Sequence, residues 1–340
     1  MKFVELREEQ IRESIDAKQM MEALEDALSR SEQFKGSMAW KKVSGNSYLY
    51  RKQSSYADWK SLGPDSEENR KRYDAFVEGK QSAKERLSSI KENMDIRAKF
   101  AKAAGINRVS VIIANLCRQI EKSGLSGAVS VVGTNAIYAY EEMAGCRVVS
   151  GLLATRDLDF LWDSKKKIYL LAEEEASGFM DIIKKVDKSF ERSKELYRAI
   201  NSDGFMIDLI KAEQKDMRVD DRDQLGNIYD LKASGIGSLK WLISSPKVDA
   251  ILIDRQGYPF RMSVPDPRCF AIHKLWLSER PDRDPDKAKR DYEQAIVVAG
   301  LIIDHLPMYR FKKEELKMFP EEVAKKGIAS LARYERNREI

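Results

Sequence analysis

Hydrophobic side chains in the N-terminal part of the chain recur at helical intervals among many charged residues. Between residues 3 and 34 this pattern predicts one or two amphipathic helices. Residues 38–52 instead alternate aliphatic or aromatic with polar side chains around Gly45, the pattern of a small β-hairpin. Helical intervals return between residues 65 and 102. Residues 1–104 are therefore expected to form a helical region that carries one hairpin.

After Gly105 short apolar segments alternate with helical ones, which is typical of a mixed α/β domain. Strands are predicted at residues 129–132, 147–153, 157–162 and 205–210, and helices at 109–120, 135–143 and 173–186. A β-pair that turns at Gly257 follows, and from Asp266 the pattern is helical again. We expect a second domain over residues 105–265 and a helical C-terminal region over residues 266–340.

Composition and charge narrow the class of protein. Hydrophobic residues make up 43% and charged residues 34% of the chain, which indicates a helix-rich globular protein. The three cysteines lie far apart, so neither a CxxC motif nor a disulfide framework is expected. The charged N-terminus lacks the apolar stretch of a signal peptide, and the longest apolar run, residues 295–303, is too short to span a bilayer. We therefore expect a cytoplasmic protein without membrane segments.

The net charge of +5 is compatible with phosphate-bearing ligands. It is too small to indicate nucleic-acid binding, because acidic and basic residues are interspersed. Trp40, Tyr48 and Tyr50 in the predicted hairpin are rings on which bases can stack, but packing in the core of the hairpin is the favoured interpretation. Charge and aromatic content alone therefore assign no partner.

Two aspartates on the strand predicted at residues 157–162 are the first candidates for chemistry. Asp157 and Asp159 are two positions apart, so the pleat of a strand directs both carboxylates to one face. Two like charges there require a cation, and Mg²⁺ prefers oxygen ligands and shares its coordination with substrate phosphates. A solvent-facing strand edge is the simpler alternative. Asp208, in a later apolar strand, is a candidate third ligand, or it receives a structural arginine.

Gly133 and Thr134 lie where a predicted buried strand gives way to a helix. Glycine permits close approach to the backbone, and the N-terminal amides of a helix favour an anion such as a triphosphate. The Thr134 hydroxyl adds a donor, and this role is compatible with its alternative role as a helix N-cap. Together with the aspartates, this turn makes a more specific pattern than any one part.

The order of these features resembles the DNA polymerase β-type nucleotidyltransferase superfamily, which has a strand, a Gly-Gly or Gly-Ser turn, a helix, Asp-x-Asp and a later carboxylate. The sequence is most similar to a bacterial group of nucleotidyltransferase-fold proteins of mostly unassigned role. That similarity rests on SVVGTNAIYAYEEMAG, ATRDLDFLW, GFMIDLI and VPDPRCFAIHKLWLSERPDRDPDKAKRDYEQA, over about residues 105–300, and GSMAWKKVSGNSYLYRK extends it. Thr134 departs from the usual glycine or serine. The 22 residues between it and Asp157 exceed the common spacing, which an inserted strand at 147–153 would explain.

The resemblance implies an α/β (α+β) fold with a short mixed sheet flanked by helices. It makes residues 105–265 a nucleotidyltransferase catalytic domain and residues 266–340 a region that closes the nucleotide site. It implies metal-dependent transfer of a nucleoside monophosphate from a triphosphate such as ATP to an acceptor hydroxyl. The cofactor would be Mg²⁺ or Mn²⁺. The acceptor stays open between tRNA or another RNA, a protein and a small molecule.

The resemblance also implies that Lys274 contacts the nucleotide phosphates and that Asp291 positions this lysine; the simpler interpretation of Lys274 is a surface side chain. Asp157, Asp159 and Asp208 would be the catalytic, metal-binding residues. A protein that binds nucleotide without turnover is the alternative function. Hydrolysis at a dimetal site is less favoured, because the only histidines are His273 and His305 and neither belongs to a ligand cluster.

Overall fold

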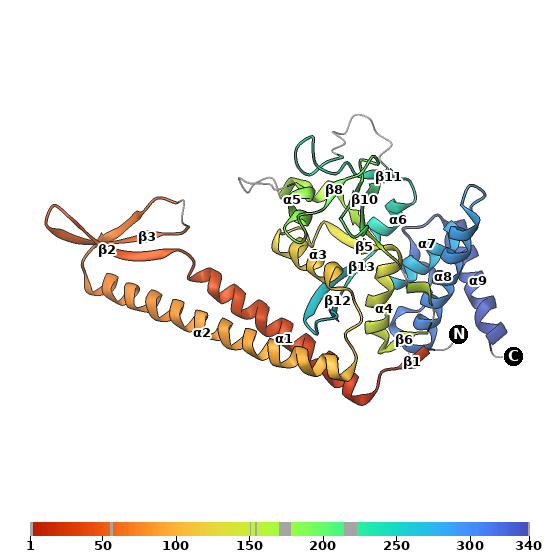
Figure 1. Cartoon of the computed structure of the whole chain (residues 1–340), viewed down its shortest axis with the longest axis horizontal. Coiled ribbons are helices and arrows are strands. Elements are labelled where there is room, and N and C mark those ends of the chain that lie inside the picture. The colour runs from red at the N-terminus through yellow and green to blue at the C-terminus, as the bar shows by residue number, and fades with distance from the viewer. Residues whose placement is uncertain are drawn as a thin grey trace. The chain divides into compact units, whose positions relative to one another are not determined.

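The chain folds into two compact units in the computed structural model (Figure 1). The structure describes residues 3–54, 57–149, 151–153, 155–169, 178–213 and 223–338. The first unit, here called the core unit, comprises Met1–Ile11, Arg108–Arg255 and Phe260–Ile340. The second, here called the hairpin unit, comprises Arg12–Asn107 and Gln256–Pro259.

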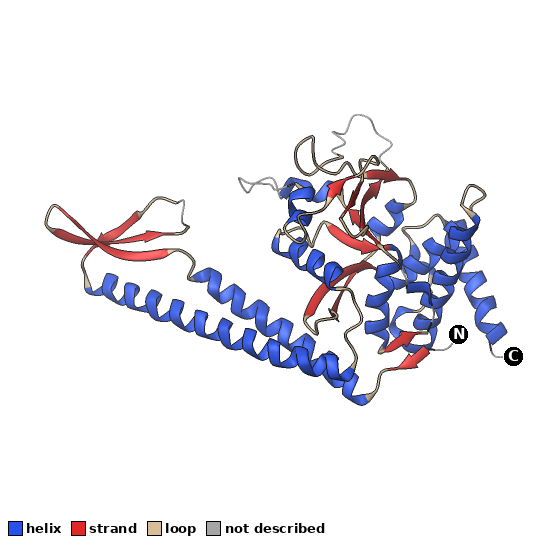
Figure 2. Cartoon of the chain, in the orientation of Figure 1, coloured by secondary structure: helices blue, strands red, loops and turns tan. Residues whose placement is uncertain are grey.

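Two long helices and a small sheet make up the hairpin unit, as Figure 2 shows. Its elements are α1 (Glu8–Gln33), β2 (Ser37–Val43), β3 (Asn46–Lys52), β4 (Lys60–Pro64) and α2 (Glu67–Ala104). The Ser66 side chain caps α2 by accepting a hydrogen bond from the backbone N–H of Asn69. The helix ends before Gly105, whose backbone is in the left-handed region. The strands pair antiparallel in the order β2-β3-β4. The predicted hairpin is confirmed, and β4 adds a third strand that the sequence did not indicate.

One face of this sheet packs on the helices. Met38 and Leu49 form a core with Phe76 of α2, and Trp40 packs against it. The rings of Trp40 and Tyr73 are 6.1 Å apart. The prediction that the aromatic side chains pack in the core of the hairpin is therefore confirmed for Trp40, whereas Tyr48 and Tyr50 are not part of this cluster.

A short mixed sheet forms the centre of the core unit. The strands follow the order β5-β7-β10-β9-β8, and β11 also pairs with β10. Their bounds are β5 (Val129–Val132), β7 (Asp157–Trp162), β8 (Glu191–Arg192), β9 (Arg198–Ile200), β10 (Met206–Ala212) and β11 (Ser234–Ile236). β7 is parallel to β10 and antiparallel to β5. The strands predicted at 129–132 and 157–162 have the expected bounds, and the strand predicted at 205–210 corresponds to β10.

Helices and a separate β-pair surround the central sheet. They are α3 (Val111–Lys122), η1 (Gly133–Asn135), α4 (Ala136–Ala144), η3 (Ser164–Tyr169), α5 (Phe179–Lys184), α6 (Leu239–Ser244), β12 (Lys247–Ile253), β13 (Pro259–Pro265), α7 (Pro267–Ser278), α8 (Pro285–His305), η4 (Pro307–Tyr309), η5 (Lys313–Leu316) and α9 (Glu321–Arg338). The α+β class predicted from the sequence is confirmed. Residues 173–177 of the helix predicted at 173–186 lie outside the described residues. Within the described parts of the chain, no helix combines the length and apolar character that a membrane crossing requires.

The strand predicted at residues 147–153 is longer than the strand observed. Among the described residues here, the strand is β6 (Cys146–Val148), which pairs antiparallel with β1 (Phe3–Glu5). The chain then forms the short 3-10 helix η2 (Gly151–Leu153). The long spacing between Thr134 and Asp157 therefore contains, after α4, a strand that pairs with the N-terminal β1 and a short 3-10 helix.

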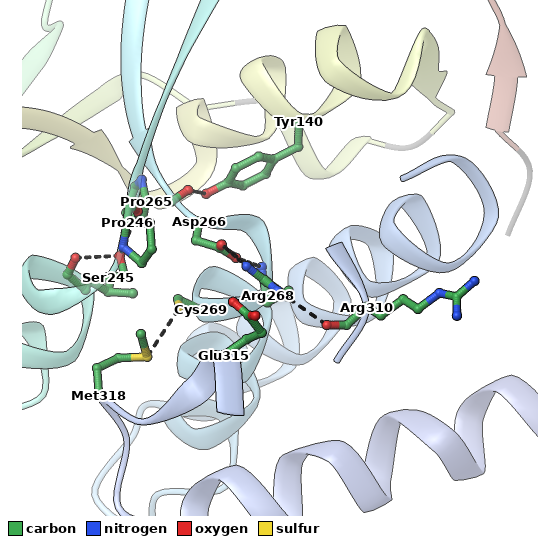
Figure 3. A network of polar contacts seen from close by, with 11 residues as sticks. Tyr140, Ser245, Pro246, Pro265, Asp266, Arg268, Cys269, Arg310, Glu315 and Met318 are labelled. Atoms are coloured by element: carbon green, nitrogen blue, oxygen red, sulfur yellow. Dashed lines mark hydrogen bonds and ion pairs between the residues drawn. The ribbon is translucent and has the colours of Figure 1, made fainter. Parts of the chain in front are cut away.

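The start of α7 is anchored by the polar network in Figure 3. Asp266 caps the helix and also receives the Arg268 guanidinium, with Nη2 2.6 Å from Oδ2. The Tyr140 hydroxyl donates to the Pro265 carbonyl at 2.9 Å, which ties α4 to the same place. Arg268 also forms an ion pair with Glu315. This network fixes the first turn of the helix that carries Lys274.

Candidate functional site

The three predicted carboxylates lie on two neighbouring strands. Asp157 and Asp159 alternate on β7 with Leu158 and Phe160, which are fully buried on its other face. β10 runs parallel to β7 and pairs Asp208 with Asp159 in register. The fold therefore brings Asp157, Asp159 and Asp208 to one region of the central sheet.

Asp208 forms an ion pair with an arginine, the alternative to metal binding that the sequence analysis left open for this residue. Arg198 lies opposite it on β9, and its Nε and Nη2 donate to Oδ1 and Oδ2 at 2.7 Å each. Asp157 accepts a hydrogen bond from the Thr155 hydroxyl, which is a neutral donor. In the part of the chain that the structure describes, neither Asp157 nor Asp159 forms an ion pair. No group of three or more histidine, cysteine or acidic side chains in that part is arranged to hold a metal ion.

The electrostatics of Asp159 indicate that a cation would be favourable here. Burial, together with the charges of Asp157 and Asp208, raises the pKa of Asp159 to about 7, against the lowering effect of Lys274 and Arg198. Carboxylates supply the hard oxygen donors that Mg²⁺ and Mn²⁺ take in proteins. The donor chemistry of Asp157 and Asp159 thus fits a divalent ion.

Gly133 connects the predicted phosphate turn to these aspartates. Its φ of +68° lies in the left-handed region that favours glycine. A Cβ atom at this position would lie 2.2 Å from Asp159 Oδ2, which is far inside van der Waals contact. The turn between β5 and α4 can therefore approach the carboxylate only because residue 133 has no side chain.

Two buried amides that sequence analysis missed hold this turn in place. Gln294 of α8 donates from Nε2 to Thr134 Oγ1 at 2.9 Å, and Asn135 Nδ2 donates to the Asp157 carbonyl at 2.7 Å. Gln294 is 1% exposed, and its Oε1 has no hydrogen-bond partner among the described residues. In the sequence, only their positions could have indicated a role: Asn135 directly follows the Gly-Thr pair, and Gln294 follows Asp291 by one helical turn.

Lys274 and Asp291 form the contact that the resemblance implied. Lys274 Nζ on α7 lies 2.6 Å from Asp291 Oδ1 on α8. Arg283, from the loop between these helices, donates to Asp291 Oδ2 from Nε at 2.9 Å and from Nη2 at 2.7 Å. Asp291 is buried, and Lys274 lies near enough to Asp159 to influence its pKa. That Lys274 contacts nucleotide phosphates stays a prediction.

His273 belongs to the packing of α7. Its Nε2 lies 3.0 Å from Ser238 Oγ, and its ring packs against Trp241 and Trp276. Burial lowers the pKa of His273 to about 3, with a smaller contribution from the charge of Lys274. The residue is therefore neutral at physiological pH and stabilises the helix interface.

Comparison with known families agrees with this geometry. A family model described as Nucleotidyltransferase matches residues 112–318, more than half of the chain. The match contains Gly133, Thr134, the three aspartates and the Lys274–Asp291 pair. No curated protein and no solved structure matches the chain. On the strength of the family match, the chain belongs to a nucleotidyltransferase family.

Proposed function

We propose that the protein transfers a nucleoside monophosphate from a triphosphate to an acceptor hydroxyl in a metal-dependent reaction. The observation that carries this proposal is the close approach of Gly133 to Asp159, which places a turn suited to phosphate beside a carboxylate pair suited to a divalent ion. The positive φ of Gly133 would favour glycine in any turn, but the space that Asp159 Oδ2 occupies beside it adds a second requirement for a residue without a side chain.

Asp157 and Asp159 would hold Mg²⁺ or Mn²⁺. A bound divalent ion would supply the positive charge that a triphosphate needs when its α-phosphorus is attacked. Asp208 lies next to Asp159, and Arg198 takes one lone pair on each of its oxygens. Because a carboxylate has about four acceptor sites, Asp208 retains the capacity to act as the third carboxylate.

The protein groups around the aspartates would bind the phosphates. Because Gln294 donates to Thr134 Oγ1, the hydroxyl proton of Thr134 is left to donate to a phosphate oxygen. Lys274 adds a positive charge, and Asp291 holds that ammonium in place. These residues would stabilise the departing pyrophosphate.

The reaction follows from this arrangement of charges. The acceptor oxygen attacks the α-phosphorus, its proton leaves with help from Asp208 or solvent, and the bond between the α-phosphorus and the bridging oxygen breaks. The products are a nucleotidylated acceptor and pyrophosphate. An RNA 3′ end such as that of tRNA, a protein side chain and a small molecule all offer the required hydroxyl, and ATP is a candidate donor.

The Arg198–Asp208 pair favours one alternative, a protein that binds nucleotide without turnover. Incubation with each α-³²P-labelled triphosphate, Mg²⁺ or Mn²⁺ and cell extract separates the two functions. We expect one macromolecule or metabolite to gain label. Asp157→Asn and Asp159→Asn, which keep the shape of the side chain, should lower labelling by about 10³-fold or more, since they remove the metal ligands. Nucleotide binding without any label transfer by the unmodified protein would establish the alternative.

A further inference from the structure

The outer face of the small sheet in the hairpin unit presents aromatic rings around a lysine. Ala39 and Lys41 of β2 lie opposite Tyr50 and Tyr48 of β3 in register, so these four side chains share one face. Lys41 Nζ lies 4.0 Å from the centre of the Trp59 ring and 5.2 Å from the centre of the Tyr50 ring. We call Lys41, Tyr48, Tyr50 and Trp59 the aromatic platform.

The core of the hairpin unit does not use the platform. The residues that pack against α2, such as Leu49 and Trp40, alternate with the platform residues and lie on the opposite face. Tyr48, Tyr50 and Trp59 are each partly exposed. The Lys41 ammonium lies over the Tyr50 and Trp59 rings, so these ring faces contact a polar group and not the apolar core, and a stacked base would take the place of that ammonium.

Basic residues are concentrated in the chain that forms this sheet. Residues 35–64 contain six lysine and arginine residues against one aspartate, a net charge of +5 that equals the net charge of the whole protein. The preceding helix α1 has three basic and eight acidic residues. Positive charge therefore does not continue along α1, whereas α2 has ten basic and seven acidic residues. Lys42 and Lys60 are exposed.

We propose that the aromatic platform binds single-stranded nucleic acid. Unpaired bases present flat faces that stack on tyrosine and tryptophan, and the lysines around the rings supply positive charge that neutralises phosphates. Base pairs of a duplex would hide those faces. A second copy of the chain is disfavoured as the occupant, because two surfaces of the same positive charge repel each other.

This inference goes beyond nucleotidyl transfer and depends only on the hairpin unit. If the platform binds nucleic acid while no transfer occurs, the proposed chemistry fails and the platform stands. If transfer occurs while oligonucleotides do not bind, the platform proposal fails and the chemistry stands. Asp159→Asn, which removes a proposed metal ligand, should leave oligonucleotide binding unchanged.

Fluorescence anisotropy with the full-length protein tests the platform. The probes are fluorescein-labelled twelve-residue RNA and DNA single strands and the corresponding duplex, each at two salt concentrations. We expect single strands to bind more tightly than duplex. Trp59→Ala and Tyr50→Ala should each weaken binding by about 5- to 100-fold, the range for loss of one stacked base. Lys60→Ala should weaken binding to all oligonucleotide sequences equally. It should also make the affinity less dependent on salt concentration, by the amount expected for about one phosphate contact.

Matched variants separate loss of stacking from loss of fold. Trp59→Phe and Tyr50→Phe keep a ring and should retain most of the affinity, whereas Lys71→Ala removes an exposed lysine of α2 that pairs with Glu67 and should have no effect. Circular dichroism of each variant verifies the helices of the hairpin unit. Equal affinity of the ring-deleted and unmodified proteins for oligonucleotides would overturn the proposal. So would preference for duplex, or binding to phosphatidylserine vesicles but not to oligonucleotides.

Discussion

Charged side chains serve different purposes in the two units. In the core unit Asp208 and Asp291 are buried, and each is held by arginine or lysine from another element. In the hairpin unit the Arg70–Asp65 pair is exposed, as are the many pairs at helical spacing. Removing a charge from water costs several kcal/mol per ion, whereas an exposed pair contributes little. Buried charges in the core unit therefore have specific roles, the anchoring of α7 for Asp266 and the proposed chemistry for Asp208 and Asp291, whereas the exposed pairs contribute little to stability.

Replacing Asp291 tests this contrast with the largest expected effect. Asp291→Asn leaves Lys274 and Arg283 near each other without their common counter-charge. Loss of one partner of a buried pair lowers the free energy of unfolding by about 3–5 kcal/mol. Thermal melting of the purified proteins measures the effect.

Asp65→Asn is the control from the hairpin unit, because Asp65 also pairs with an arginine through both oxygens but in solvent. We expect a far smaller change in melting temperature for this variant. Equal shifts for the two variants would show that burial does not distinguish the two sets of charges.

The second test concerns two glycines with nearly the same backbone conformation. Gly133 has a φ of +68° and Gly105, at the end of α2, a φ of +71°. Alanine at either position is strained, by about 1 kcal/mol. Only at Gly133 would the new methyl group meet Asp159, because nothing lies within 4 Å of the corresponding atom at Gly105.

We therefore expect Gly133→Ala to reduce label transfer by about 100-fold or more, in line with the loss of an oriented site. Gly105→Ala should keep full activity and show only a modest loss of stability. Transfer assays and melting curves on both variants measure these effects. A Gly133→Ala protein with unchanged activity would remove the argument that this turn faces the reaction.

Sequence patterns predicted those parts of the site that depend only on residues near one another in the chain. The strands predicted at residues 129–132 and 157–162 have the observed bounds, because their apolar side chains are buried on the pattern that a strand requires. The face shared by Asp157 and Asp159 follows directly from the pleat. β4 was not predicted because glycine and proline, here Gly63 and Pro64, are disfavoured within strands. Its pairing with β3 is also irregular, with a register shift between Leu49 and Tyr50.

Long-range partners could not be predicted. Gln294 and Thr134 are 160 positions apart, and no pattern in either segment indicates the other. Arg198 meets Asp208 only because β9 and β10 pair in one particular register. The sequence predicted a strand at residues 147–153 but not its partner, and β6 pairs with β1 at the other end of the core unit's sequence.

The third test uses pH. The pKa of His273 is about 3 in the folded protein, against an ordinary value of about 6.5. As pH falls below 6.5 the unfolded chain takes up a proton that the folded chain does not, so folding becomes less favourable by about 1.4 kcal/mol per pH unit. Between pH 7 and pH 5 the loss is about 2 kcal/mol.

His273→Gln removes this titration, so between pH 7 and pH 5 its free energy of unfolding in urea should fall by about 2 kcal/mol less than that of the unmodified protein. His305→Gln replaces the other histidine and serves as the control, which should keep the pH dependence of the unmodified protein. The same pH dependence in His273→Gln and the unmodified protein would contradict a buried neutral imidazole.

The smallest effect is expected at Gln294, and it separates activity from stability. Gln294→Leu removes the donor to Thr134 Oγ1 and also removes a buried carbonyl oxygen that has no partner among the described residues. The variant should be as stable as the unmodified protein or more so, because an apolar side chain of similar size leaves no unsatisfied group. Transfer should fall by about tenfold, the value of one hydrogen bond that orients the hydroxyl.

A double-mutant cycle with Thr134→Val decides whether Gln294 acts through Thr134. If the amide works by orienting that hydroxyl, the double variant should be no slower than Thr134→Val alone, since there is no hydroxyl left to orient. Independent losses that multiply would assign Gln294 a separate role. Non-additivity would show that α8, the helix that also carries Asp291, orients Thr134 through a buried polar contact.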